Sequence, residues 1–531
     1  MVDQDWIHTK TYSAEKIALA QRILEQVNAG SEVDKAVSEN PLPGGEGYMG
    51  KNVLVAAYNQ LVESGEWPSD PELLARIRMK PVRSLSGVTV VTVLTKPYPC
   101  PGKCIFCPTD VRMPKSYLPD EPGAMRGLHH EFDPFDQVTA RLEALQAVGH
   151  PTDKIELLVL GGTWSAYRKD YQEWFILRCF DALNGVASVA LEEAHTINET
   201  AEHRSVGLVI ETRPDHIDQE ELSWLRYLGV TKVQIGAQSL DNHILELNKR
   251  GHTVEETIHA VSLLRAAGFK IVLHWMPNLY GATPSSDRKD FTGLWGELCP
   301  DELKIYPNQL LANAELYEYW QRGEYQPYTT EELIDLIAEI KTTIPRYCRV
   351  NRVIRDIPST NVVEGNKRTS LRQDIQAEMK KRGTLCQCVR CREVRNQFIS
   401  EGELELHDLV YQAGQVEEHF ISYDTGNDKL VGFLRLSFPG EGAPDSGIHD
   451  LERAAIIREV HVYGQSLEVG KKQHGIAQHA GLGTMLLEDA EQVAKDQGFN
   501  RIAVIAAVGT RQYYLKRGFK RGDLYLIKEL A

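Results

Sequence analysis

Nine cysteines occur in the 531 residues, and six of them form two tight clusters. The first cluster is Cys100, Cys104 and Cys107 in the stretch CPGKCIFC, with the spacing Cys-x3-Cys-x2-Cys. Three thiolates on one loop can bind three irons of a four-iron cluster and leave the fourth iron open, whereas a closed structural zinc site needs four protein ligands. The spacing therefore favours a 4Fe-4S site with an open iron. A zinc loop completed by a distant residue is the alternative.

Glycine and polar residues follow three later segments that we expect to be strands. They are Gly161, Gly162 and Thr163 after LLVL, Glu211 and Arg213 in IETRPD, and Gln238 at the end of VQIGAQ. Taken singly, such pairs are more often turns or surface contacts. In this order behind the cysteine loop, the pattern resembles the radical S-adenosylmethionine (radical SAM) superfamily. The resemblance implies that the open iron chelates S-adenosylmethionine, that these six residues contact it, and that an electron from the reduced cluster releases a 5′-deoxyadenosyl radical.

A second set of residues near the C-terminus is typical of a nucleotide-binding helix end. The loop QHAGLG contains Gln478, Gly481 and Gly483 and precedes an apolar helix, where successive backbone amides can bind a pyrophosphate. The neighbouring segments are an expected strand at 459–462, an expected strand at 502–508, and the pair Tyr513 and Tyr514. This order resembles the GNAT family of N-acetyltransferases. The resemblance implies acetyl-CoA binding, with Tyr514 facing the thioester, although either tyrosine could serve for core packing.

Together, the two modules resemble the catalytic subunit of Elongator in its single-chain bacterial or archaeal form. Matching stretches include KPYPCPGKCIFCP, DKIELLVLGGT, IETRPD, LNKRGHT, LKIYPNQL, REVHVYG, QHAGLGT and VGTRQYYLKRGF. The resemblance implies a tRNA-modifying acyltransferase that installs a carboxymethyl-type group on carbon 5 of the wobble uridine. It also assigns acetyl-CoA contacts to Lys154, Glu459, Val460, His461, Val462, Leu482, Gly483, Thr484 and Tyr514, of which Lys154 and Tyr514 are the expected catalytic residues.

The implied partners are a tRNA anticodon stem-loop and an external electron donor, while a homo-oligomer or accessory subunits remain open. The net charge of −15 disfavours a polyanionic partner, but its distribution is uneven. Residues 76–126 contain nine Lys and Arg against three Asp and Glu, and residues 341–395 contain fourteen against five. These basic tracts could face phosphates, or they could be ordinary solvated surfaces.

The second cysteine cluster is Cys386, Cys388 and Cys391 in CQCVRC, within the second basic tract. Cys348 is the expected fourth ligand, although nothing local fixes its position. Four thiolates closing on zinc would stabilise a segment that has little apolar core of its own. Free thiols are the alternative.

These sites require elements that position them, and the chain divides into four stretches. Residues 1–80 have helical periodicity and are a candidate tRNA-binding region. Residues 81–330 alternate strands and helices, which requires a parallel sheet with working residues at the carboxyl ends of its strands. Residues 331–400 form a basic zinc-binding connector, and residues 401–531 form an α+β domain. We therefore expect an α/β protein: a partial (β/α) barrel of the radical SAM type, a GNAT domain and a small helical N-terminal region.

Composition fits a globular protein, with 42% apolar and 25% charged residues. The sequence has no apolar run long enough to span a bilayer and does not start like a signal peptide, which predicts a cytoplasmic protein without membrane contact.

Two other function classes are compatible with parts of the sequence. One is a protein lysine acetyltransferase in which Glu459 deprotonates the amine and the iron–sulfur cluster is only structural. The other is a non-enzymatic tRNA scaffold. The intact residues expected to bind S-adenosylmethionine argue against the lysine acetyltransferase. Asn278, Tyr280 and Gly281 depart from the Asp-Leu-Pro type of loop expected there, which leaves substrate details at this loop undefined.

Overall fold

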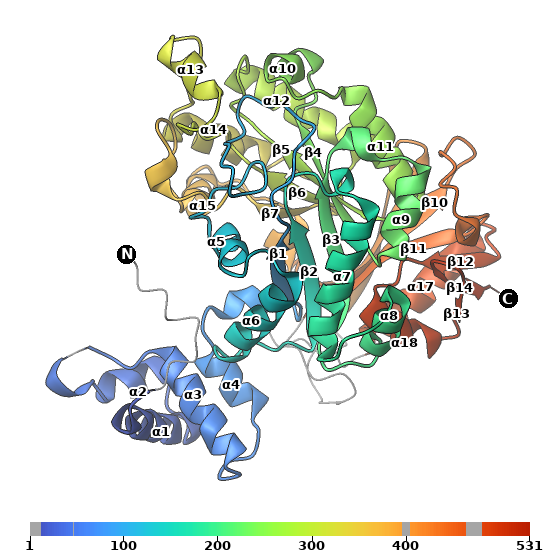
Figure 1. Ribbon diagram of the computed structural model, residues 1–531. Coiled ribbons are helices and arrows are strands. Elements are labelled where there is room, and N and C mark those ends of the chain that lie inside the picture. Colours follow the sequence, from blue (N-terminus) through green and yellow to red (C-terminus); the bar gives the residue numbers. More distant parts are fainter. Residues whose placement is uncertain (1–11, 46, 396–403, 464–480, 531) are drawn as a thin grey trace.

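The computed structural model describes residues 12–45, 47–395, 404–463 and 481–530 (Figure 1). Four helices form a separate N-terminal unit: α1 (Ala14–Asn28), α2 (Val33–Glu39), α3 (Lys51–Glu63) and α4 (Pro71–Ile77). Apolar faces of α1 and α3 meet in its own core, which includes Ile23, Leu24 and Leu54. The unit is anchored to the rest of the chain by Arg78, whose Nε donates a 2.6 Å hydrogen bond to the carbonyl of Gly149.

The central domain is a seven-stranded parallel sheet in which the strands follow one another in sequence order. They are β1 (Thr89–Leu94), β2 (Lys154–Leu160), β3 (Arg204–Thr212), β4 (Lys232–Gln238), β5 (Lys270–Trp275), β6 (Glu302–Ile305) and β7 (Arg349–Arg352). β1 and β7 are its two edges, so the sheet is a curled half-barrel rather than a closed barrel. Because all strands are parallel, their carboxyl ends meet at one rim, as the sequence predicts.

Helices connect these strands, and several cover the outer face of the sheet (Figure 1). They are α5 (Pro122–His129), α6 (Pro134–Gln146), α7 (Lys169–Asn184), α8 (Leu191–Asn198), α9 (Gln219–Tyr227), α10 (Asn242–Leu247), α11 (Val254–Ala266), α12 (Pro284–Gly293), α13 (Leu316–Gln321) and α14 (Thr330–Ile340). The helix α11 has well-defined ends. It begins with a capping box between Thr253 and Glu256 and ends before Gly268, which has a φ of +75°.

The half-barrel continues into the range expected to be a connector. β7 pairs in parallel with β6, and α15 (Leu371–Lys381) packs on α14. The sequence of β7, RVNR, contains one apolar residue, so it has no strand periodicity to recognise. A short helix, α16 (Val389–Arg392), carries the end of the second cysteine cluster.

The C-terminal domain is a seven-stranded mixed sheet in the order β13-β14-β12-β11-β10-β9-β8. Its strands are β8 (Leu404–Ala413), β9 (Val416–Thr425), β10 (Leu430–Pro439), β11 (Ala455–Val462), β12 (Arg501–Val504), β13 (Lys520–Arg521) and β14 (Leu526–Glu529), with helices α17 (Leu482–Asp496) and α18 (Arg511–Leu515). β11 and β12 are parallel and every other neighbouring pair is antiparallel. The expected α+β domain is thus present.

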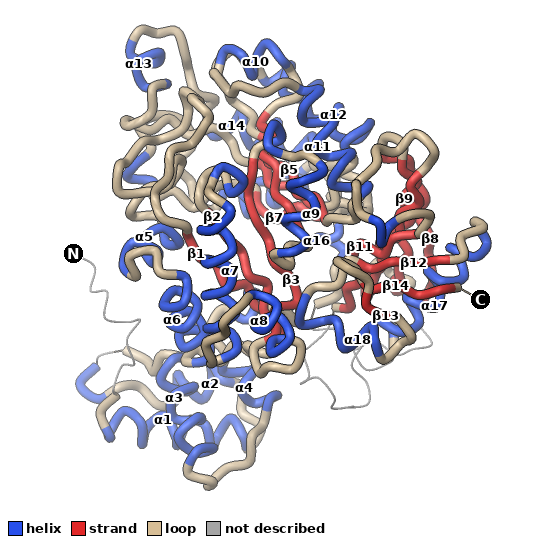
Figure 2. The backbone as a smooth tube through the Cα atoms, turned by 45° about the vertical axis from the view of Figure 1, so that its right-hand side comes forward, coloured by secondary structure: helices blue, strands red, loops and turns tan. Residues whose placement is uncertain are grey.

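The two sheets lie side by side (Figure 2), and their buried apolar residues form one continuous core. Buried charges also cross the boundary. Asp301, at the start of β6, contacts Arg458 and Arg435 of the C-terminal sheet, and Arg265 of α11 contacts Glu418. No helix in the described ranges combines the length and apolar character needed to span a membrane.

Candidate functional site

The loop with the first three cysteines follows β1 at the carboxyl rim of the half-barrel. Cys104 is buried, and Cys100 and Cys107 are half-buried. Nη1 of Arg250 lies 3.6 Å from the Cys104 sulfur, and the backbone N–H of Gly102 donates to Cys100 Sγ at 3.4 Å. A hydrogen bond from Cys107 and, against the effect of burial, the charge of Arg250 lower the pKa of Cys104 to about 5. The same hydrogen bond raises the pKa of Cys107, so Cys104 is the thiolate of this pair, the ionisation state that binds metals.

The thiols of the two cysteine clusters are arranged differently. Within the described ranges, only Cys386, Cys388 and Cys391 form a set of three ligand atoms that all lie within 4.8 Å of one another. Zinc bonds of about 2.3 Å require sulfurs roughly 4 Å apart. The three loop thiols do not form such a set, although Cys104 and Cys107 are hydrogen-bonded to each other. Their donor set fits a four-iron cluster.

One cavity of about 750 Å³ connects this loop with the C-terminal domain. The lining includes Cys100, Cys104 and Cys107 at the loop end, and Glu459, Val460, His461 and Tyr514 at the other end. Side chains on the inner face of the half-barrel line the space between. Ligands bound to the two domains would therefore share one chamber.

Gly161–Thr163 passes beside the cysteine loop immediately after β2. Gly161 and Gly162 have φ values of +148° and +80°. A Cβ atom on Gly161 would lie 1.7 Å from Thr95 Oγ1, so only glycine fits this position. Thr163 Oγ1 lies 3.6 Å from Cys100 Sγ, and Gly162 and Thr163 line the cavity. The backbone here is exposed to a ligand bound next to the cluster loop.

Glu211, on β3, is a half-buried carboxylate that faces the same chamber. It accepts hydrogen bonds from Tyr117 Oη at 2.8 Å and from Lys304 Nζ at 3.1 Å, and His274 Nε2 lies 3.8 Å away. Burial raises the pKa of Glu211, but the charge of Lys304 and the nearby His274 outweigh this effect and the net pKa is lowered. An ionised carboxylate at this position can accept hydrogen bonds from ribose hydroxyls.

Arg213 supports the cysteine loop. Its Nε and Nη2 donate to both carboxylate oxygens of Asp215 at 2.8 and 2.7 Å, and its Nη1 donates to the carbonyl of Arg250 at 2.9 Å. A Cβ atom on Gly102 would lie 2.5 Å from Arg213 Nη1, so the guanidinium is packed directly against the loop. It contributes positive charge to the cavity wall while its donors are held by protein groups.

Gln238 ends β4 with a φ of +70°, and its side chain lines the cavity. Its Oε1 atom is buried, and no hydrogen-bond donor in the described ranges reaches it. Such an unsatisfied acceptor costs about 1–3 kcal/mol. A ligand amine, as in the methionyl group of S-adenosylmethionine, would satisfy it.

The C-terminal sheet opens where β11 separates from β12. The two strands pair only from Ala455 to Ile457 of β11, although β11 continues to Val462. Glu459, Val460 and His461 line the cavity at this opening, and Val462 lies outside the lining. The second half of β11 is therefore splayed away from β12.

The amino end of α17 lies beyond this opening. Gly481 has a φ of +76°, and a Cβ atom on Gly483 would lie 2.6 Å from Tyr513 Oη. Thr484 Oγ1 accepts hydrogen bonds from Nε and Nη2 of Arg517 at 3.2 and 2.9 Å. A helix N-terminus beside an arginine suits a pyrophosphate. Of the residues expected here, Leu482 is buried, and Gln478 lies outside the described residues.

The two neighbouring tyrosines have different surroundings. Tyr514 is buried and lines the cavity, and burial raises its pKa, so its hydroxyl stays protonated. Tyr513 lies outside the lining, with the guanidinium of Arg517 3.6 Å from its ring centre. This geometry favours Tyr514 as the tyrosine that faces a thioester.

Lys154 is not brought together with Tyr514 in this chamber. It is the first residue of β2, at the opposite end of the strand from Gly161, and it lies outside the cavity lining. Its register partner Arg204 packs against Gly509 of the C-terminal domain. Lys154 thus lies near the boundary between the domains rather than at the chamber.

Glu459 is held by two cations. Lys270 Nζ lies 2.5 Å from its Oε1, and Arg435 Nε lies 2.9 Å from its Oε2. Burial raises the pKa of Glu459, but these two charges outweigh burial and the net pKa is lowered. A carboxylate of this kind is a weak general base.

Sequence reasoning missed the charged groups inside the half-barrel. Lys232 pairs with Glu156 at 2.6 Å, Lys270 pairs with Glu302 at 2.6 Å, and Asn351 donates to Glu302 at 2.5 Å. The only signal was a lysine or glutamate within each otherwise apolar strand. They make the middle of the chamber polar.

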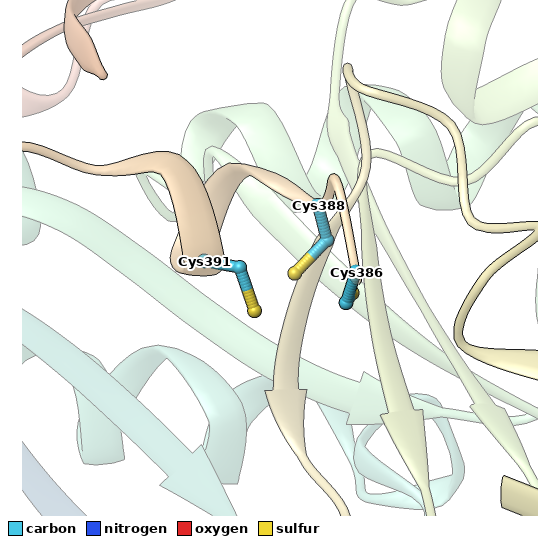
Figure 3. A group of neighbouring side chains, drawn as sticks. All are labelled: Cys386, Cys388 and Cys391. Atoms are coloured by element: carbon cyan, nitrogen blue, oxygen red, sulfur yellow. The ribbon is translucent and has the colours of Figure 1, made fainter. Parts of the chain in front are cut away.

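The second cysteine cluster forms a compact group at the start of α16 (Figure 3). Hydrogen bonds from Cys386 and Cys391 lower the pKa of Cys388 despite its burial, which favours a thiolate. The three sulfurs lie close enough together to supply three of the four ligands of a zinc ion. Cys348 is buried nearby and its carbonyl accepts from the Val389 N–H at 2.9 Å, but its sulfur lies outside the compact group.

Asn278, at the unexpected loop, is a buried structural residue. Its N–H donates to Asp287 Oδ2 at 2.9 Å, and its Oδ1 accepts from the N–H of Tyr328 at 3.0 Å. Asn278 has a φ of +70°, and its hydrogen bonds connect three segments of the loop region.

The fold and this chamber define a radical SAM domain fused to an acetyltransferase domain, and family models match both. The Radical SAM superfamily model matches residues 98–290, the Radical_SAM C-terminal domain model matches residues 300–381, and the acetyltransferase (GNAT) family model matches residues 390–519. The second match includes β7, which agrees with the extended half-barrel.

Whole-chain similarity is more specific. The chain is 42% identical over 529 residues to the tRNA uridine(34) acetyltransferase of Methanocaldococcus jannaschii, covering 96% of this chain and 97% of that protein. It is 37% identical to Elongator complex protein 3 of Homo sapiens, covering 86% and 87%. The structure of archaeal Methanocaldococcus infernus Elp3 with an N-terminal deletion superposes with a TM-score of 0.72 at 39% identity, covering 84% of this chain and 100% of that one. The chain belongs to the family of tRNA uridine(34) acetyltransferases and Elongator complex protein 3.

Proposed function

We propose that this protein installs a carboxymethyl-type group on carbon 5 of the wobble uridine of tRNA. The single cavity that joins the cysteine loop to Tyr514 carries this proposal, because it brings the expected sites of two cosubstrates into one space. The printed names of the relatives supply the substrate class. Carbon 5 of uracil is not acidic and an acetyl methyl group is a poor electrophile, so joining them calls for one-electron chemistry.

When bound, the 4Fe-4S cluster and S-adenosylmethionine would supply a radical able to remove a hydrogen atom from the acetyl methyl group of acetyl-CoA. Cys100, Cys104 and Cys107 would hold the cluster. Glu211 and Gln238 would orient S-adenosylmethionine through hydrogen bonds. The external electron that this chemistry needs would come from a separate donor.

Acetyl-CoA would bind at the opening between β11 and β12. The part of β11 that does not pair with β12 would pair with pantetheine. The amino end of α17, together with Arg517, would hold the pyrophosphate. The Tyr514 hydroxyl would donate to the thioester or its leaving sulfur. Glu459 would act through its ion pair with Lys270, which fixes β11 against the half-barrel.

The charge of the chamber supports a nucleic-acid substrate. Its described lining contains fourteen Lys and Arg against seven Asp and Glu, although the whole chain is acidic. Arg213, Arg435 and Arg458 are paired with carboxylates outside the lining, which leaves eleven cations against seven carboxylates. Such a concentration of positive charge attracts phosphates. Extruding the base from the anticodon loop would cost about a few kcal/mol, which phosphate contacts can offset.

A protein lysine acetyltransferase is less consistent with the site. That activity needs a general base at the opening, and Glu459 is held ionised by Lys270 and Arg435. A conformation that frees Glu459 would have to break both ion pairs.

The test is anaerobic reconstitution of the full chain with iron and sulfide, followed by S-adenosylmethionine, [2-13C]acetyl-CoA, a reductant and tRNA. Nucleoside mass spectrometry should detect a uridine that carries the label, together with 5′-deoxyadenosine. Replacing all three loop cysteines by alanine should abolish both products, while Cys179→Ala, in a buried thiol of α7, should retain them. If the tRNA stayed unlabelled after reaction with a protein whose cluster is fully assembled, the proposal would be refuted.

A further inference from the structure

A column of aromatic rings runs from the cysteine loop to the protein surface. Tyr98 and Tyr167 have ring centres 4.7 Å apart, Tyr167 and Tyr171 are stacked at 5.2 Å, and Tyr171 and Trp174 lie 5.6 Å apart. Three of the rings belong to α7 or the turn before it, on the outer side of the half-barrel (Figure 1). Tyr98 precedes Cys100 by two residues. The column therefore connects the loop with the outer surface.

The inner part of the column is fixed to the segment that leads into the cysteine loop. Tyr167 is buried, and its hydroxyl donates to the carbonyl of Lys96 at 2.7 Å and lies 2.8 Å from Thr95 Oγ1. The backbone N–H of Lys96 donates to the Tyr171 hydroxyl at 3.2 Å. These contacts hold Tyr167 and Tyr171 against the backbone that leads into the cysteine loop.

The outer part is exposed and cationic. Trp174 is 42% exposed and Tyr98 is 37% exposed, so a large aromatic side chain reaches solvent at each end of the column. Lys96 Nζ lies 4.5 Å above the Tyr171 ring, and Lys103 is exposed between Cys100 and Cys104. Neither lysine has an acidic partner in the described ranges. We call Lys96, Tyr98, Lys103, Tyr171 and Trp174 the outer aromatic face.

This face is separate from the chamber. None of its five residues lines the cavity in the part of the chain that the structure describes. In the proposed reaction the chamber would hold S-adenosylmethionine, acetyl-CoA and the uridine, so an electron donor needs another approach to the cluster. Cys100 is half-buried and lies between exposed Pro99 and Pro101, which makes the loop approachable from outside.

We propose that the outer aromatic face is the docking surface for an acidic, low-potential iron–sulfur carrier protein of the ferredoxin type. The lysines would attract the acidic carrier, and Tyr98 and Trp174 would form the apolar centre of the contact. One electron passes from the reduced carrier to the oxidised cluster, so the carrier is oxidised and the cluster reduced by one electron, with no bond made or broken. This inference rests on the proposed function, since it requires the cluster.

The test measures cluster reduction rather than product formation. Reconstituted full-length protein without tRNA or acetyl-CoA is mixed anaerobically with reduced ferredoxin, and bleaching of the cluster absorbance is followed by stopped flow. Trp174→Ala and Lys103→Glu should each lower the second-order rate constant about tenfold or more, and increasing salt should reduce the difference for the charge variant. Photoreduced deazaflavin, a small neutral reductant, should reduce all variants at the wild-type rate.

Matched controls are Tyr48→Ala, an exposed aromatic residue of the N-terminal unit, and Lys381→Glu, an exposed lysine of α15. Both should react with ferredoxin like the wild type. Equal ferredoxin rates for wild type and face variants would overturn the inference. A tenfold loss of tRNA affinity in Trp174→Ala with an unchanged ferredoxin rate would also overturn it and assign the face to nucleic acid. Failure of the wild type to assemble a cluster would instead contradict the proposed function.

Discussion

Arg458 donates hydrogen bonds to both carboxylate oxygens of Asp301, at 2.8 Å to Oδ2 and 2.6 Å to Oδ1. Arg458 lies on β11 of the acetyltransferase sheet, Asp301 immediately precedes β6 of the half-barrel, and both side chains are fully buried. Burial raises the pKa of Asp301, but the charges of Arg458 and Arg435 outweigh it and keep the pKa below its usual range. This pair fixes the relative position of the two domains, and therefore the shape of the chamber between them.

Asp301→Asn should strongly destabilise the contact between the two domains. Two buried arginines would lose their shared counter-charge, which costs about 3–5 kcal/mol when a buried pair is broken. Thermal unfolding of the full chain should shift to a clearly lower midpoint. Asp335→Asn, at a half-exposed ion pair with Arg288 and Arg382, should change the midpoint little. An unchanged midpoint for Asp301→Asn would show that the pair does not hold the domains together.

Glu211→Gln should weaken S-adenosylmethionine binding without unfolding the protein. The substitution replaces the carboxylate that would accept from the ribose hydroxyls by a neutral amide, and the loss of a hydrogen bond to a charged group, about 1.5–3 kcal/mol, corresponds to a roughly 10–100-fold increase in Kd. Equilibrium dialysis on the reconstituted protein measures this. Glu220→Gln, on the exposed surface of α9, is the control and should bind like the wild type.

Tyr514→Phe should lower acetyl-CoA turnover more than Tyr513→Phe. Tyr514 faces the chamber with a protonated hydroxyl, and loss of such a donor typically costs about 100-fold. Tyr513 lies outside the chamber lining beside Arg517, so its loss should mainly affect the affinity for acetyl-CoA. Thiol release, measured as initial rates over a range of acetyl-CoA concentrations, separates the two effects. A larger fall in kcat for Tyr513→Phe would reverse the assignment.

Cys391→Ala should abolish zinc binding, whereas Cys348→Ala should retain about one zinc per chain. The compact sulfur group contains the first residue and leaves out the second. Metal analysis after dialysis against a weak chelator measures both variants. Loss of zinc from Cys348→Ala in a protein that still folds would establish Cys348 as the fourth ligand.

His419 should make the C-terminal sheet more stable in mildly acidic solution. Its Nδ1 lies 2.7 Å from Asp408 Oδ2 and its Nε2 lies 3.3 Å from Glu417 Oε1. Burial lowers the pKa of His419, but these carboxylates outweigh it and the net pKa is raised. The stabilisation is therefore complete below the unfolded value of about 6.5 and is lost as pH rises through the higher folded value. The midpoint difference between wild type and His419→Gln should be larger at pH 6 than at pH 8.5; an equal difference would contradict this.

Much of the half-barrel could be predicted from sequence because its strands are apolar and end in recognisable loops. The stretches before Gly161 and before Glu211 both identified strands and placed chemistry at their ends. β7 was missed because RVNR lacks periodicity, and β8 was missed because its residues are largely exposed. Propensity does not identify strands whose pairing depends on neighbours far away in the sequence.

The site was predictable where function depends on local spacing and not where it depends on tertiary contacts. The cysteine loop and the glycines after β2 could be read from short motifs. Lys270 and Glu302 could not, because each is an isolated charge in an apolar strand, and only folding brings them to Glu459. Lys154 shows the converse, since a residue assigned by resemblance lies at the far end of its strand from the chamber.

The buried ion pairs between the two domains also affect how the gene for such a chain can evolve. An isolated acetyltransferase half would keep Arg435, Arg458 and Glu418 but lose Asp301 and Arg265, their partners from the other half. Buried charges without partners would make the isolated acetyltransferase half prone to misfolding and degradation. Once these pairs had formed, splitting the gene between the two domains would have destabilised both halves, so the two domains would be expected to be inherited as one chain.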